Sequence, residues 1–180
     1  VVQDGLTTLT LDLVQPTPAD PAKGMTVSAV TEGSAPRTFE HSGDRLPIRL
    51  NPAGRAGERR SVVVRYRGVP ATGLLIANNK HGERTFFSDN GPIKARQWLP
   101  TLDHPSDKAT SEMIVNAPAH YQVVSNGLLV EETDLGNGRR RSHWRQSVPI
   151  ATWLNVLGVA RFAVEHRPSW RGLPIDTWVY

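Results

Sequence analysis

The sequence predicts an all-β protein, built as an antiparallel β-sandwich or saddle. Short segments of alternating apolar and polar residues recur about every ten residues, and Gly, Asn and Pro separate them. No apolar pattern with helical spacing extends over twelve residues or more. A chain of 180 residues is long enough for one domain with a full core, so we expect residues 1–180 to form a single domain.

The first half of the chain contains seven segments with the pattern of strands. Between residues 6 and 14, Leu9, Leu11 and Leu13 alternate with polar residues, which predicts a strand with one buried face. Pro47 marks its own segment as an edge or bulged strand, because proline has no amide hydrogen to donate. The expected strands are residues 6–14, 25–30, 37–41, 45–50, 59–67, 74–77 and 84–88, with turns at 42–44 and 79–82.

The second half continues the same pattern, with an Asn126-Gly127 turn between two of its strands. Residues 149–162 are ambiguous, because their apolar run fits a short helix as well as a buried strand. Gly158 and the neighbouring valines favour a strand that is entered through a bend at Pro149. The other expected strands are residues 111–116, 121–125, 128–133, 139–146 and 173–180.

Composition and charge exclude several functions. The net charge of +4 permits nucleic-acid binding, but the 21 basic residues are interleaved with 17 acidic ones, so we expect solvated faces and no nucleic-acid partner. No apolar run is long enough for a membrane segment. The absence of cysteine excludes disulfides, thiolate zinc sites and cysteine catalysis. The compartment stays open between cytoplasm and secretion.

The sequence offers no catalytic or metal site of its own. Its six histidines lie far apart, and none has the His-x-x-x-His or His-x-His spacing of a metal site. It has no Gly-x-Ser-x-Gly elbow and no phosphate-binding glycine loop. We therefore expect neither catalytic residues nor metal ligands in this chain.

The stretch 96–110 is unusually rich in special residues, and we interpret it as structural. A carboxylate at Asp103 or Asp107 is suited to capping a turn through backbone amides, and Arg96 and Lys108 are suited to pairing with these carboxylates. The prolines set the path of the loop, and Trp98 is the tryptophan most suited to face a partner. The expected structural motif consists of Arg96, Trp98, Pro100, Asp103, Pro105, Asp107 and Lys108.

Three segments together resemble one family. They are Ala95-Arg-Gln-Trp-Leu-Pro-Thr-Leu-Asp-His-Pro-Ser-Asp-Lys-Ala109, Val124-Ser-Asn-Gly127 and Pro149-Ile-Ala-Thr-Trp-Leu-Asn-Val-Leu-Gly158. Their order and approximate spacing are similar to those in the N-terminal domain of aminopeptidase N-like (membrane alanyl aminopeptidase) zinc metallopeptidases of the gluzincin class. The resemblance covers residues 6–180, and the first segment carries most of its specificity.

The resemblance implies a β-saddle that contacts a catalytic domain and closes one side of its substrate cleft. The zinc and the chemistry belong to that second domain, whose Gly-x-Met-Glu-Asn and His-Glu-x-x-His motifs do not occur here. The implied partners are the protein's own catalytic domain and a peptide substrate, and this chain alone is expected to be inactive. The chain is expected to lack the family's first one or two strands and to end at the domain boundary.

The resemblance also implies where the domain reaches substrate. Many members have a Gln or Glu five residues before the position of Arg96 that helps to bind the substrate amine, and this position is Gly91 here. Asp89 or Asn90 is then expected to take over amine recognition at the rim of the cleft, unless that role is lost. Thr101 and His104 replace a family Cys and Glu, which indicates a divergent, bacterial branch.

Two alternatives remain beside this reading. A β-sandwich binding or adhesion module without peptidase activity would rely on an exposed aromatic or basic face. Polynucleotide binding on an arginine-rich face would require an affinity that falls steeply with salt.

Overall fold

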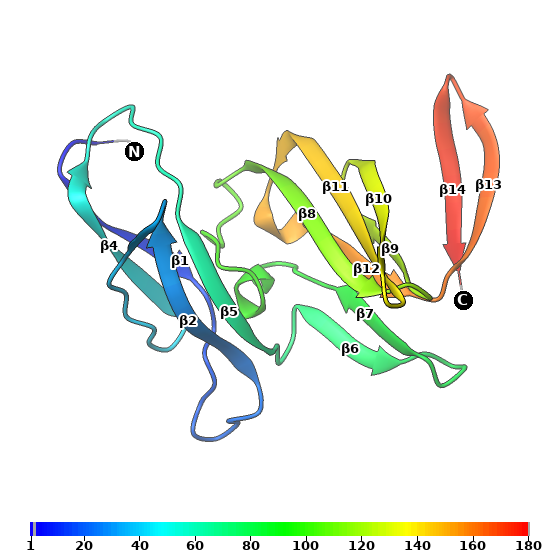
Figure 1. Ribbon diagram of the computed structural model, residues 1–180, viewed down its shortest axis with the longest axis horizontal. Helices are drawn as coiled ribbons and strands as arrows, with labels where there is room; N and C mark the ends of the chain where they lie inside the picture. Colours follow the sequence, from blue (N-terminus) through cyan, green and yellow to red (C-terminus); the bar gives the residue numbers. More distant parts are fainter. Residues whose placement is uncertain (2, 180) are drawn as a thin grey trace. The chain divides into compact units, whose positions relative to one another are not determined.

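The structure is a computed structural model that describes Val1 and residues 3–179, and it confirms the all-β fold. The described residues form strands and two short 3₁₀ helices, η1 (Ala95–Gln97) and η2 (Thr152–Leu154) (Figure 1). The strands are β1 (Leu6–Asp12), β2 (Gly24–Glu32), β3 (Ala35–Pro36), β4 (Arg45–Gly54), β5 (Val63–Val69), β6 (Leu74–Asn78), β7 (Arg84–Ser88), β8 (Ala109–Pro118), β9 (Gln122–Ser125), β10 (Leu128–Gly136), β11 (Arg139–Ile150), β12 (Leu157–Ala160), β13 (Ala163–Trp170) and β14 (Leu173–Val179).

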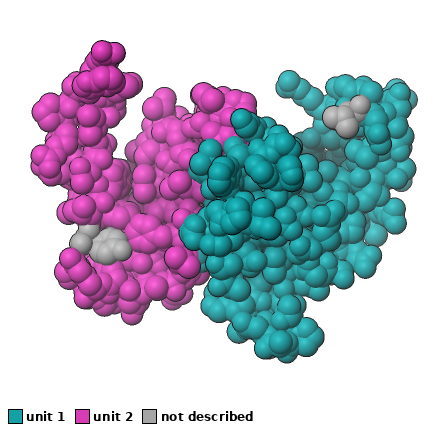
Figure 2. Space-filling view, turned by 180° about the vertical axis from the view of Figure 1, so that it is seen from behind, with its two compact units in different colours: residues 1–74, 89–108, 151–154 teal, residues 75–88, 109–150, 155–180 magenta. Residues whose placement is uncertain are grey.

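The chain divides into two compact units, which are coloured separately in Figure 2. Unit 1 consists of residues 1–74, 89–108 and 151–154. Unit 2 consists of residues 75–88, 109–150 and 155–180. Each unit is made of three segments that are separate in the sequence. The expectation that residues 1–180 form a single domain stays a prediction.

Unit 1 contains two small antiparallel sheets, β1-β4 and β3-β2-β5. The alternation in β4 places Leu46 and Ile48 in the core, where Leu13 and Val30 also lie, all at most 2% exposed. Of the leucines of the first predicted strand, only Leu13 is fully buried, whereas Leu9 and Leu11 are partly buried. β1 is the strand partner of β4 in this sheet, and on the other side of β4 residues 38–40 add a bridge and two backbone hydrogen bonds, so the edge at Pro47 is partly covered.

Unit 2 contains three antiparallel sheets, β10-β11-β8, β6-β7-β12-β9 and the separate hairpin β13-β14. Its core cluster is formed by Ala117, Val123 and Val159 from β8, β9 and β12. Partly buried hydrophobic residues pack around that cluster, among them Phe86 and Trp144. The first two sheets therefore share a small core.

Three expectations about local structure need correction. Residues 37–41 are not a regular strand: Phe39 forms only an isolated bridge with Ile48. Glu40 N donates to Pro47 O, but Pro47 has no amide hydrogen with which to return the bond. The ambiguous run at 149–162 divides into the end of β11, the helix η2 and β12, so both readings were partly correct. The strand β13 was not expected.

Glu32, at the end of β2, is held by two arginines of unit 1. Arg60 donates from Nε to Glu32 Oε1 and from Nη2 to Glu32 Oε2, both at 2.6 Å, and Arg37 Nε donates to Oε2 at 2.8 Å. The hydrogen bonds from Arg60, more than those from Arg37, lower the pKa of Glu32 from 4.5 to about 2. The charged carboxylate is thus favoured in the folded state.

This lowered pKa predicts an acid-sensitive contribution to stability. Because the folded pKa lies below the unfolded one, the contribution is present above pH 4.5 and is lost as the pH falls toward about 2. The variant Glu32→Gln should therefore lose stability relative to wild type at neutral pH, and the difference should shrink through this window. Urea unfolding at pH 7, 4 and 2.5 measures it. A difference that stays constant with pH would contradict the pairing.

Candidate functional site

Arg96 is the centre of a charged cluster in unit 1. Its Nε donates to Asp103 Oδ2 at 3.2 Å, and its Nη1 donates to Asp44 Oδ2 at 2.9 Å. Its Nη2 lies 3.6 Å from Asp12 Oδ2. Three carboxylates from separate parts of the chain therefore converge on one planar guanidinium, whose fork of donors suits such an arrangement.

Asp103 is the most enclosed member of this cluster, with a side chain that is 0% exposed. Besides the guanidinium, it accepts hydrogen bonds from the backbone amide of Arg96 at 3.2 Å and from Thr152 Oγ1 at 2.9 Å. The amide of Asp103 donates in turn to Asp12 Oδ2 at 2.9 Å. Asp103 thus links η1, η2 and the end of β1, which agrees with the bracing role expected from the sequence.

The other motif residues have different roles. Pro105 occupies the second position of a turn that is closed by a hydrogen bond from Asp107 N to His104 O at 3.0 Å. Pro100 follows η1 and precedes the bridge between Thr101 and Asp12. Asp107 and Lys108 are exposed, and their side chains form no hydrogen bond or ion pair with another described residue. The side-chain cap expected of Asp107 and the pairing expected of Lys108 are therefore not seen.

Trp98 is buried, and both its ring and its backbone carry hydrogen bonds within unit 1. Trp98 Nε1 donates to Asn90 Oδ1 at 2.8 Å, and Tyr66 Oη donates to Trp98 O at 2.9 Å. Burial raises the pKa of Tyr66, which keeps its hydroxyl protonated as a donor. Within the described residues Trp98 is thus a support for Asn90, not a ring presented to solvent.

The candidate site is the turn formed by Asp89, Asn90 and Gly91. Asn90 is only 3% exposed and its side chain contacts Trp98, so it is a positioning residue. Gly91 has no side chain to offer. The Asp89 side chain is 58% exposed, and its Oδ2 accepts a hydrogen bond from Lys94 Nζ at 2.9 Å. That hydrogen bond lowers the pKa of Asp89, so the accessible carboxylate is charged.

Two residues that the sequence did not single out hold this turn. Lys94 supplies the partner of Asp89, and its backbone amide also donates to Asn90 O at 2.9 Å. Gly73 O accepts from Asp89 N at 2.8 Å, and a Cβ at Gly73 would lie 2.3 Å from Lys94 O. The close approach of the turn to Gly73 therefore requires glycine there. The positive φ of 79° at Gly73 also favours glycine at this position.

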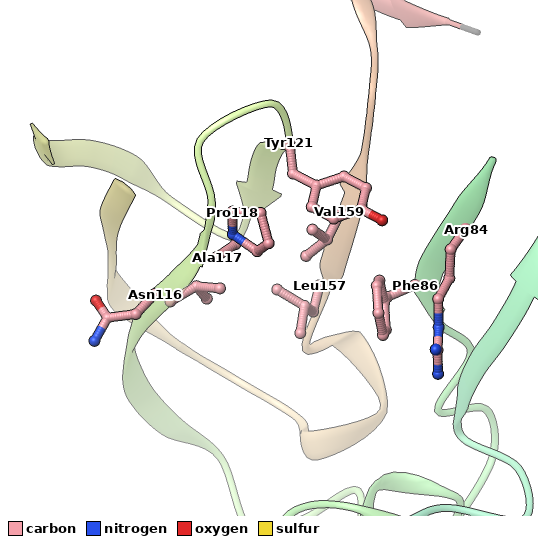
Figure 3. A pocket seen from close by; sticks show the side chains of 9 residues that line it. Arg84, Phe86, Asn116, Ala117, Pro118, Tyr121, Leu157 and Val159 are labelled. Atoms are coloured by element: carbon pink, nitrogen blue, oxygen red, sulfur yellow. The ribbon is translucent and has the colours of Figure 1, made fainter. Parts of the chain in front are cut away.

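Unit 2 contains a cavity of about 420 Å³ that the sequence did not predict. In Figure 3, Phe86 and Pro118 lie on opposite sides of it, with Leu157 and Val159 between them. Its lining is mainly apolar and includes no carboxylate, histidine, serine or threonine. The polar lining residues are Arg84, Asn116 and Tyr121.

The described residues also lack a metal centre. Among Val1 and residues 3–179, no group of three or more His, Asp or Glu side chains is arranged to hold a metal ion. The described residues therefore offer no ligand set for zinc. Among the described helices, none is long and apolar enough to cross a membrane.

Several curated aminopeptidases are similar to about half of this chain. Aminopeptidase A from Gloydius brevicauda is 32% identical over 91 residues, which cover 51% of this chain and 10% of that protein. Glutamyl aminopeptidase from Homo sapiens is 29% identical over 107 residues, which cover 53% of this chain and 11% of that protein. The matched part thus spans about a tenth of the length of these relatives.

Solved structures show the same fold over nearly the whole chain. The M1 zinc metallopeptidase from Deinococcus radiodurans superposes with a TM-score of 0.79 at 24% identity, covering 97% of this chain and 39% of that one. Legionella pneumophila aminopeptidase A in complex with aspartic acid gives a TM-score of 0.76 at 20% identity, covering 96% of this chain and 20% of that one. These likenesses establish the architecture.

The family model described as the Peptidase M1 N-terminal domain matches residues 28–154. The match includes the turn at Asp89 and, from the Arg96 cluster, Asp44, Arg96 and Asp103, whereas Asp12, β1 and β12 lie outside it. Since it covers most of the chain, and the fold agrees with M1 peptidases of known structure, this chain belongs to the Peptidase M1 N-terminal domain family.

Proposed function

We propose that this chain is the non-catalytic N-terminal domain of a zinc-dependent aminopeptidase, in which it forms one wall of the substrate cleft. Family membership and the likeness to aminopeptidases support this role. The chain spans only 39% of the D. radiodurans enzyme, and the described residues hold no metal cluster. The catalytic domain would therefore bind the zinc and hydrolyse the peptide, and this domain would shape one wall of the substrate cleft and place charged side chains on it.

The observation that carries the cleft-wall role is the exposed, charged carboxylate of Asp89 on a turn that is fixed from several sides. Trp98 holds Asn90, and the amide of Asp89 is bound to Gly73 O. A carboxylate fixed in this way needs little reordering before it accepts a charged hydrogen bond. The free amino terminus of a peptide is the group that such a carboxylate recognises.

Lys94 affects both the charge and the hydrogen bonding of Asp89. Its ammonium keeps Asp89 charged and occupies Oδ2, and the exposed side chain leaves room for a second cation near the carboxylate. Asn90 and Gly91 shape the turn but contribute no free side chain. Of the three residues expected at the rim, Asp89 is thus the one proposed to contact substrate.

The variant Asp89→Asn in the full-length protein tests this role. Loss of a charged hydrogen bond to the substrate amine should raise KM for a peptide substrate roughly tenfold. The value of kcat should change much less, because the contact is made in the ground state and in the transition state alike. Steady-state kinetics on aminoacyl chromogenic substrates measure both values.

Glu40→Gln serves as the matched control. Glu40 is also an exposed carboxylate of unit 1, but it lies outside the turn. The control should retain the wild-type KM. Equal KM values for Asp89→Asn and wild type would reject Asp89 as an amine ligand.

A further inference from the structure

The cavity of unit 2 lies beside the core that its two larger sheets share. The strands β7, β8 and β12 line it, and Tyr121 lines it from the connection between β8 and β9. Every lining residue belongs to unit 2. The cavity is therefore a feature of one compact unit, and its shape does not depend on how the two units are arranged.

Apolar side chains of this core also form the walls of the cavity. Ala117 and Val159 are members of the buried core cluster, and Phe86, Val115 and Leu157 pack against that cluster. Protein interiors seldom leave voids larger than a water molecule. A volume of about 420 Å³ is instead within the range of small-molecule sites. An apolar occupant would remove these walls from water, so the cavity favours one.

Arg84 places a positive charge beside the apolar walls. Its guanidinium carbon lies 5.5 Å from the centre of the Phe86 ring. Arg84 is exposed, and its side chain forms no hydrogen bond or ion pair with another described residue. The neighbouring acidic residue, Glu83, is paired with Arg161 at 2.8 Å. The planar fork of donors on Arg84 is thus available to a carboxylate.

Tyr121 contributes a second donor next to the same ring. It packs edge-on against Phe86, with ring centroids 6.2 Å apart, and Figure 3 shows its hydroxyl on the side of the cavity where Phe86 and Arg84 lie. The hydroxyl forms no hydrogen bond with another described residue, and a phenol can donate one. The third polar lining residue, Asn116, is engaged elsewhere, because its Oδ1 accepts from Arg141 Nε at 3.1 Å.

This combination of groups selects the charge of the occupant. No Asp or Glu lines the cavity, so a buried ammonium group would have no counter-charge there. A carboxylate would find a guanidinium and a hydroxyl on one side, and its apolar body would find the walls. The chemistry therefore favours an anion with an apolar body over an amine or a zwitterion.

We propose that the cavity of unit 2 binds a small carboxylate with a compact apolar body. The body would lie between Phe86 and Pro118, and the carboxylate would accept hydrogen bonds from Arg84 and Tyr121. This inference goes beyond the proposed function and does not rest on it, because the cavity lies in unit 2 and Asp89 lies in unit 1.

Isothermal titration calorimetry of the full-length protein with 3-phenylpropanoate tests the site. We expect binding with a Kd below about 1 mM. The neutral 3-phenylpropanamide has the same apolar body and should bind about tenfold more weakly, because it makes no charge-assisted hydrogen bond. L-Phenylalanine, which adds an ammonium group to the same skeleton, should also bind more weakly than 3-phenylpropanoate at this site.

The variant Arg84→Gln identifies the site that the ligand occupies. It should weaken 3-phenylpropanoate about tenfold and leave the affinity for the amide nearly unchanged, because only the carboxylate interacts with the guanidinium. Arg171→Gln is the matched control: Arg171 is also an exposed arginine of unit 2, with its guanidinium 4.6 Å from the Trp170 ring, but it does not line the cavity. The control should retain the wild-type Kd.

Val115→Phe is the second variant, since a larger side chain at this lining position should fill the cavity and abolish binding. If it does not fold, Arg84→Gln decides alone, because Arg84 is exposed and unpaired. Absence of 3-phenylpropanoate binding, or a Kd that is equal in wild type and Arg84→Gln, would overturn the proposal. Tighter binding of L-phenylalanine through the same arginine would also overturn it.

Aminopeptidase activity measured on the same samples separates this inference from the proposed function. An active enzyme whose ligand affinity is insensitive to Arg84→Gln would reject the carboxylate site and retain the function. Arginine-dependent binding in a full-length protein without aminopeptidase activity would support the site and reject the function.

Discussion

The variant Asp103→Ala is expected to destabilise the protein by about 3–5 kcal/mol, since it removes one partner of a buried ion pair. The Asp103 side chain is wholly buried, and its loss leaves the largely buried Arg96 guanidinium with weaker compensation. The hydroxyl of Thr152 and the amide of Arg96 also lose their acceptor. A change of this size is a large fraction of the stability of a typical domain. Urea unfolding followed by circular dichroism measures it.

Asp107→Ala is the control for this experiment. Asp107 lies four positions further along the same loop, but its side chain is exposed and forms no hydrogen bond or ion pair with another described residue. Its replacement should change the stability by less than about 0.5 kcal/mol. A similar loss in both variants would mean that the loop tolerates no substitution and that the Arg96 cluster has no special role.

The second large effect is expected for Gly127→Ala. Gly127 has a φ of +82°, and a Cβ there would lie 1.9 Å from the backbone oxygen of Arg145. Neither the turn nor the adjoining strand β11 can relieve a backbone clash cheaply. Strain at positive φ and overpacking each cost about 1–3 kcal/mol, so the variant should lose roughly 3 kcal/mol or more. Thermal and urea unfolding measure the loss.

Gly138→Ala separates the two causes. Gly138 has a similar φ of +70°, but a Cβ there meets no atom within 4 Å. It should therefore show the conformational cost alone, about 1 kcal/mol. If the two alanine variants lost equal stability, the contact between position 127 and Arg145 would have no part in the effect.

Much of the fold could be predicted because its signals are local. The alternating leucines of β1 and the Asn126-Gly127 turn depend on side chains and dihedral angles within a few residues. The strand β13 was missed, because Pro168 and its charged residues obscure the alternation over 163–170. A regular strand was wrongly predicted at residues 37–41. Pro47 has no amide hydrogen to donate to the facing segment, and only the strand register shows that Glu40 faces Pro47.

The site at residues 89–91 stays a prediction from the resemblance, and its local geometry could not be predicted from the sequence. The resemblance did not distinguish Asp89 from Asn90. That distinction depends on the distance between Asn90 Oδ1 and Trp98 Nε1, which is a tertiary contact. The link between Asp103 and Thr152 joins residues 49 positions apart, and no local pattern reports it. Composition also gave no sign that Lys94 would pair with Asp89.

The central claim is that this chain is the non-catalytic domain of a zinc aminopeptidase. The most direct measurement compares the hydrolysis of aminoacyl chromogenic substrates by the 180-residue chain and by the full-length protein, with the zinc content of both. We predict that only the full-length protein binds stoichiometric zinc and hydrolyses the substrates. Hydrolysis by the 180-residue chain alone, or a zinc-free full-length protein without activity, would contradict the account.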